Sequence, residues 1–192
     1  MVRGFLTNPV QSIKKTKKQK NMGKTITDLA LVGVITAIAV LIASIRTPLL
    51  TGSSLGLTTL ISAISVFLLV LIGGLILGWI VQIITTTLGG KGKYYEGLRA
   101  IVNTLIAPSI GALIASIFLY VPAVGTAVIF LVLAVTIALG LATLYRSIKE
   151  LFSTDIITAL VTVSVLSMAV VIAIMGATLS FASMFPMLSS VV

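Results

Sequence analysis

The stretch "GGKGKYYEGLR", residues 89–99, separates two long apolar runs and is itself glycine-rich, basic and aromatic. It can be a phosphate-binding loop, or the turn where a membrane-embedded chain returns to water. A Walker-type loop needs G-x-x-x-x-G-K followed by Ser or Thr, placed between a strand and a helix. Here glycine and tyrosine follow the two lysines. Gly89 and Gly90 suit a left-handed helix end, and the tyrosines suit the head-group region. The stretch therefore predicts a turn at a membrane surface.

The composition of the whole chain agrees with this interpretation. Of the 192 residues, 58% are apolar and only 9% are charged. An ordinary soluble domain carries about 25% charged residues, so this chain has too little polar surface to be solvated by water. We therefore predict an all-α, polytopic membrane helix bundle, inserted in the cell membrane as a multi-pass protein.

Few catalytic chemistries are open to this chain. It has no Cys and no His, and its only carboxylates are Asp28, Glu96, Glu150 and Asp155. Thiol nucleophiles, disulfides, Cys/His metal sites and imidazole bases are excluded by that composition. We expect a protein that is not an enzyme, with no catalytic residue, no metal site and no cofactor.

Five apolar runs are long enough to cross a bilayer, which takes about 20 helical residues. The predicted transmembrane helices cover residues 26–45, 57–88, 98–120, 123–148 and 155–180. The second run is long enough to be either one span or two pieces that meet at Gly73-Gly74. One span is favoured, because two would separate the basic turn from the basic N-terminus. Pro108 predicts a bend in the third span.

Two helix starts carry capping signals. Thr25 and Asp28 are spaced like a capping box at the start of the first span. Ser153, Thr154 and Asp155 offer N-cap side chains for the fifth span.

The basic residues predict the orientation of the bundle. Lys and Arg outnumber Asp and Glu by 13 to 4. With the N-terminus in the cytosol, five spans place every basic residue except Arg46 on the inside, as the positive-inside rule requires. The C-terminus is then outside. Residues 1–24 form a basic cytosolic segment, either a short interfacial helix or a solvated tail, and residues 25–192 form the five-helix domain.

The basic residues of the inner face are also the candidate binding site. Next to an apolar run, a lysine cluster favours anionic lipid head groups over nucleic acid, which we do not expect as a partner. The candidate lipid- or partner-binding residues are Lys14, Lys15, Lys17, Lys18, Lys20, Lys24, Lys91, Lys93 and Arg99.

Polar residues within the spans form a second candidate site, made of Gln82, Asn103, Thr104 and Pro108. Amides in lipid are costly unless they are paired, so these groups should point inward. They can bond across helices or line a transport path, and structural pairing is favoured. Gly74 and Gly78 form a GxxxG pair, which favours close packing within the chain over a homo-oligomer, although both remain open.

Three segments, in order, carry a family resemblance: "FLTNPVQSIKK" (5–15), "LGGKGKYYEGLRAIVNTLIAP" (88–108) and "LYRSIKELFSTDIITAL" (144–160). With them the chain resembles the Yip-domain family, the Ypt/Rab-interacting multispanning membrane proteins, and it is most similar to the short prokaryotic versions. The resemblance implies a five-helix bundle with a cytosolic N-terminus. Eukaryotic members of that family are adaptors that engage prenylated Rab-type GTPases and help shape transport membranes.

Two functions are consistent with these observations. The first is a non-enzymatic integral membrane adaptor or scaffold of Yip-domain type, which organises membrane or partner proteins at the cytoplasmic face. Its expected partners are anionic membrane lipids and a membrane-protein or small-GTPase-like partner. The alternative is a small permease or transporter subunit with a polar path near Gln82, Asn103 and Pro108.

Overall fold

The computed structural model describes residues 21–51, 57–121 and 125–184, with side-chain surroundings given for most positions up to Val170. These residues form five α-helices and no strand. Their bounds are α3 Met22–Thr51, α4 Leu57–Thr87, α5 Tyr94–Phe118, α6 Gly125–Leu151 and α7 Ile156–Met184. The basic segment expected before residue 21 lies outside the described residues, and with it lie Lys14, Lys15, Lys17, Lys18 and Lys20.

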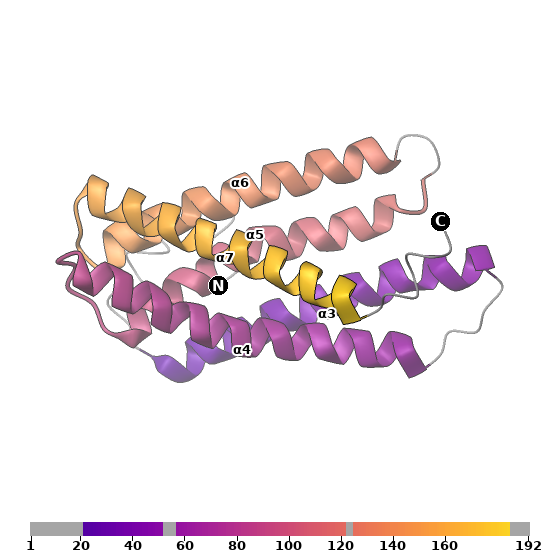
Figure 1. Ribbon diagram of the computed structural model, residues 1–192, viewed down its shortest axis with the longest axis horizontal. Helices are drawn as coiled ribbons and strands as arrows, with labels where there is room; N and C mark the ends of the chain where they lie inside the picture. Colours follow the sequence, from indigo (N-terminus) through magenta and orange to yellow (C-terminus); the bar gives the residue numbers. More distant parts are fainter. Residues whose placement is uncertain (1–20, 52–56, 122–124, 185–192) are drawn as a thin grey trace.

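The helices run up and down along the long axis of the bundle (Figure 1). α5 is the central helix, because it packs extensively against α3, α4 and α6. α7 makes smaller contacts, with α4 and α6. The turns from α4 to α5 and from α6 to α7 lie at the same end of the bundle (Figure 1). We call this end, which also holds the start of α3, the loop end.

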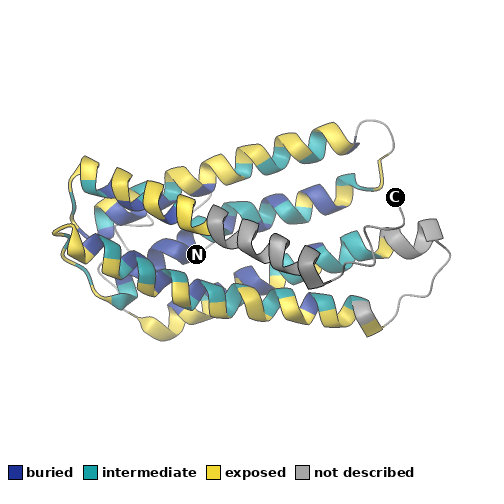
Figure 2. Cartoon of the chain, viewed as in Figure 1, coloured by how far each residue is buried: buried dark blue, intermediate teal, exposed yellow. Residues whose placement is uncertain are grey.

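The surface of the bundle is that of a membrane protein. Exposed residues run along the outer sides of several helices (Figure 2), and many of them are large and apolar, among them Phe130 at 75% exposure and Leu69 at 70%. Apolar surface on this scale needs lipid or another cover, since soluble monomers rarely expose contiguous apolar patches of more than a few hundred Å². Within the part of the chain that the structure describes, four helical stretches are long and apolar enough to cross a membrane: Met22–Ile45, Thr59–Thr87, Tyr94–Phe118 and Gly125–Leu151.

The chain is therefore a multi-pass helical membrane protein. In α7, the stretch with described side chains, Ile156–Val170, is shorter than a full crossing. Five helices are confirmed, whereas five crossings and the sidedness of the two termini stay predictions.

The first helix begins earlier than expected, and the capping box assigned to Thr25 and Asp28 is wrong. The cap is Asn21, whose Oδ1 accepts a hydrogen bond from the Lys24 backbone N–H at 3.1 Å. The Thr25 hydroxyl donates to the Asn21 carbonyl at 3.2 Å. Asp28 lies one turn further along and faces another helix, so it has no part in starting α3.

The second apolar run is one continuous helix, α4, as predicted. α5 begins at Tyr94, four residues before the predicted start, because the Glu96 carboxylate accepts the Lys93 backbone N–H at 2.9 Å. This is half of a capping box; a lysine side chain has no acceptor and cannot supply the other half. The helix continues through Pro108.

Glycines bring α4 and α5 into backbone contact. A Cβ added at Gly97 would lie 2.2 Å from the carbonyl oxygen of Gly78, and one at Gly78 would lie 2.8 Å from the Cα of Leu98. A Cβ at Gly74 would lie 2.8 Å from Cδ1 of Leu29 on α3. The GxxxG pair is therefore used for packing within the chain. By contrast, Gly73 has open space where its Cβ would be.

We predict that Gly97→Ala destabilises the bundle by about 1–3 kcal/mol, because the added methyl group must push α4 and α5 apart. Gly73→Ala is the matched control, and its midpoint of thermal unfolding in detergent should stay at or above that of the parent protein. Equal midpoints for the two variants would contradict the close approach of α4 and α5.

Candidate functional site

The turn between α4 and α5 is fixed by its own backbone. The Gly89 N–H donates to the Thr86 carbonyl at 3.1 Å, and the Gly90 N–H donates to the Thr85 carbonyl at 2.9 Å. Gly89 has a φ of +90°, a value that favours glycine. This pair of bonds is a Schellman motif, so the predicted left-handed helix end is confirmed.

The same turn is docked on the loop between α6 and α7. The Lys91 N–H donates to the Phe152 carbonyl at 3.0 Å. The Phe152 side chain is fully buried, and a Cβ at Gly92 would lie 2.2 Å from its ring. A Cβ at Gly90 would lie 2.8 Å from Cγ2 of Thr154. Only glycine at these two positions lets the turn lie flat on the neighbouring loop.

This geometry argues against a phosphate-binding loop at residues 89–93. Such a loop grips phosphate with unpaired backbone N–H groups that point at the ligand. The backbone N–H groups of Gly89, Gly90, Lys91 and Lys93 all donate to acceptors within the protein. What the turn offers outward is the exposed side chains of Lys91 and Lys93.

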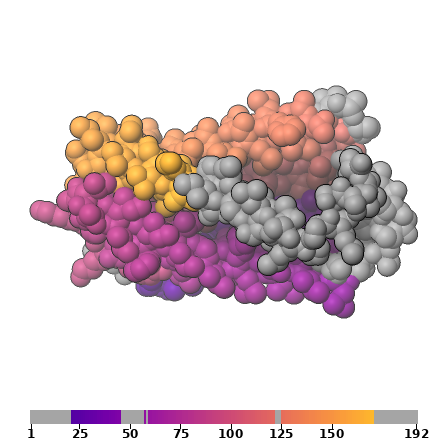
Figure 3. Space-filling model, viewed as in Figure 1, coloured from indigo at the N-terminus to yellow at the C-terminus, as the bar shows by residue number. Residues whose placement is uncertain are grey.

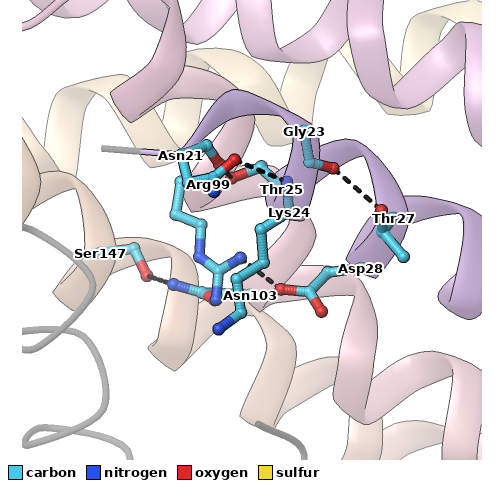
Figure 4. Close-up of polar contacts among 9 residues, drawn as sticks. All are labelled: Asn21, Gly23, Lys24, Thr25, Thr27, Asp28, Arg99, Asn103 and Ser147. Atoms are coloured by element: carbon cyan, nitrogen blue, oxygen red, sulfur yellow. Dashed lines mark hydrogen bonds and ion pairs between the residues drawn. The ribbon is translucent and has the colours of Figure 1, made fainter. Parts of the chain in front are cut away.

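An ion pair lies beneath the turn, inside the bundle. Arg99 Nη1 on α5 donates to Asp28 Oδ2 on α3 at 2.5 Å (Figure 4). The Arg99 side chain is only 4% exposed and that of Asp28 is 23% exposed. A charge at this depth needs a partner of opposite sign, and the pair ties α3 to α5.

Arg99 therefore differs from the lysines with which the sequence grouped it. Its guanidinium group points inward at Asp28, whereas the side chains of Lys24, Lys91 and Lys93 are exposed at the loop end. The exposed basic residues Arg146 and Lys149 come from the last turns of α6, at the same end. Lipid or partner binding by any of these residues stays a prediction.

Asp155 is the acidic residue at the start of α7. Its Oδ1 accepts the Thr158 backbone N–H at 3.2 Å, as the predicted N-cap should. Hydrogen bonding from the Thr158 side chain, and then from its backbone, lowers the pKa of Asp155. The carboxylate thus stays negatively charged at a helix N-terminus, where negative charge is favoured.

The polar residues within the spans, together with Pro108, take part in contacts within and between the helices. Asn103 is 2% exposed, and its Nδ2 donates to Ser147 Oγ on α6 at 3.4 Å (Figure 4). The Thr104 hydroxyl donates to the Ala100 carbonyl of its own helix at 2.8 Å. A Cβ at Gly140 would lie 3.0 Å from the ring of Pro108, so α6 packs directly on the proline.

Gln82, half-buried on α4, is the fourth of these residues. Its backbone lies beside Gly97, at the crossing of α4 and α5. The structure brings none of these four residues into a shared polar path, and the permease alternative is not supported.

Sequence reasoning missed Phe152 and the docking of one turn on the other. Ser153, with a φ of +52°, turns the chain directly after Phe152. The sequence "LFSTD", residues 151–155, held a signal for this contact, because an aromatic residue lies between the end of one predicted helix and the N-cap of the next. Apolar residues in predicted loops of membrane proteins are, however, commonly assigned to the interface.

We predict that Arg99→Met lowers stability by about 3 kcal/mol, because Asp28 is left as a largely buried charge without this partner. The exposed Lys149→Met is the control and should change the midpoint of thermal unfolding little. The double variant Asp28→Leu/Arg99→Met should recover much of the loss. Additive losses in this double-mutant cycle would contradict the ion pair.

Comparisons with known proteins agree with the architecture. The family model of the Yip1 domain matches residues 3–184, which is nearly the whole chain. No curated protein and no solved structure matches the chain. The match spans all five helices and both turns of the loop end, and it confirms the resemblance carried by the sequence. The chain belongs to the Yip1 domain family of multi-pass membrane proteins.

Proposed function

We propose that this protein is a non-enzymatic membrane adaptor or scaffold, which organises partner proteins and anionic lipid at the cytoplasmic face through its loop end. The observation that carries the proposal is that the backbone and the side chains of the turn between α4 and α5 have different roles. The backbone of residues 89–93 is engaged within the protein, while the side chains of Lys91 and Lys93 are exposed. A turn whose backbone is held in place by the protein, and whose exposed side chains are positively charged, suits binding rather than catalysis.

The charges of the loop end support the same proposal. Exposed basic side chains come from the start of α3, the turn before α5 and the end of α6: Lys24, Lys91, Lys93, Arg146 and Lys149. Each Lys or Arg near an anionic leaflet contributes about 1 kcal/mol of attraction. Family membership favours a small-GTPase-like or membrane-protein partner at this face.

The sidedness of the loop end can be measured directly, because the chain has no native cysteine. We expect Lys91→Cys to react with a membrane-impermeant maleimide only from the cytoplasmic side. Val121→Cys, exposed at the opposite end of the bundle, should react only from the other side. Val192→Cys should share the sidedness of Val121→Cys if five helices cross the membrane, and that of Lys91→Cys if four do.

The adaptor role can be tested by photo-crosslinking from single positions in native membranes. A benzophenone side chain at position 91 should crosslink specific protein or lipid partners, since the native Lys91 side chain is exposed and only its backbone is engaged. The same group at position 121 is the matched control. Identical crosslinks from both positions, or none from position 91, would argue against an adaptor surface at the loop end.

A further inference from the structure

A shallow apolar groove lies between α4 and the start of α5, next to the basic turn. Leu75, Ile76, Trp79 and Tyr94 line this groove, which has a volume of about 410 Å³. Trp79 is 57% exposed and Ile76 is 52% exposed, so the groove is open to the surrounding lipid. Its wall is set by Tyr94, whose hydroxyl donates to the Leu75 carbonyl at 3.1 Å.

The basic residues stand next to one end of the groove. Lys93 directly precedes Tyr94 in the chain, and its exposed side chain is long enough to lie over the groove's mouth. Trp79 lies eight residues before the end of α4, which is about 12 Å below the turn along the helix. The groove thus extends from the depth of lipid head groups into that of the acyl chains.

The neighbouring carboxylate, that of Glu96, is buried and not displayed at the surface beside Lys93. Glu96 is 5% exposed, and it accepts the Lys93 backbone N–H from beneath. An apolar groove whose lining residue Tyr94 directly follows an exposed lysine matches the chemistry of one class of ligand, an acyl chain attached to an anionic phosphate.

From this juxtaposition we infer that the groove and Lys93 form a binding site for one anionic phospholipid. One acyl chain lies along Leu75, Ile76, Trp79 and Tyr94, and the lipid phosphate is held by Lys93, with Lys91 adding attraction. The inference rests on the proposed function, because it needs the loop end to lie at a leaflet that contains anionic lipid. It goes further by assigning the lipid to one place on the protein.

The chain provides its own sensor for this site, since Trp79 is its only tryptophan. The protein is reconstituted in phosphatidylcholine vesicles that contain a rising fraction of brominated phosphatidylglycerol or brominated phosphatidylcholine. Bromine quenches tryptophan fluorescence on contact. We expect the phosphatidylglycerol to occupy the site about fivefold more strongly than the phosphatidylcholine, the factor given by one lysine near a phosphate. Salt should reduce that preference.

Two controls locate the effect. Lys93→Gln should abolish most of the preference, whereas Lys149→Gln, an equal loss of charge at the same end, should preserve it. In the variant Trp79→Phe/Leu69→Trp the sensor moves to another exposed position of α4, where we expect equal quenching by the two lipids.

Equal quenching of Trp79 by both lipids would overturn the inference, and so would a preference that follows Lys149 or the relocated sensor. Those results would leave the adaptor proposal standing if position 91 still crosslinked partners. If position 91 gave no crosslinks but Trp79 still showed the lipid preference, the adaptor proposal would fail and the lipid site would stand.

Discussion

The backbone contact between α4 and α5 is the interaction on which the rest of the bundle depends. In lipid, helices gain little from burying apolar side chains against each other, so close packing and interhelical hydrogen bonds must hold them together. Gly78 and Gly97 allow the two backbones to touch, and Gly74 admits Leu29 of α3 beside them. This approach places α5 at the centre of the bundle, where it also meets α6.

From this central position, successive polar side chains of α5 contact different parts of the bundle. Glu96 fixes the start of the helix, Arg99 binds Asp28 on α3, and Asn103 reaches Ser147 on α6. These residues recur every three or four positions, yet they turn to different helices, because the groups near the start of α5 are buried on nearly all sides. The space-filling view shows how α4 and the start of α7 cover the bundle near the loop end (Figure 3).

Much of this fold could be predicted from the sequence. The apolar runs gave the helices, the charge count favoured α4 as one piece, and Gly89-Gly90 correctly indicated a left-handed helix end. These features are local, since run length and a glycine pair have the same consequences in any bundle.

The candidate site was less predictable, because its key features depend on which helices become neighbours. Spacing suggested Asp28 as a cap, although its position nearly two turns into α3 lets it meet Arg99 across the bundle. Arg99 follows the lysine turn in the sequence and was therefore grouped with it, yet Lys91 and Lys93 lie before α5, whereas Arg99 lies in its second turn and meets Asp28 of α3. Phe152 stands out in the sequence only as an aromatic residue in a predicted loop, and the folded chain is needed to show that its ring packs against Gly92.

The hydrogen bond from Lys91 to the Phe152 carbonyl has a mechanical consequence. The first hairpin of the loop end, α4 with α5, and the second, α6 with α7, are joined there through their two connecting turns. A force applied to the lysine turn is consequently shared by both hairpins instead of peeling one from the other. The loop end is thus one connected surface, although it is assembled from separate parts of the chain.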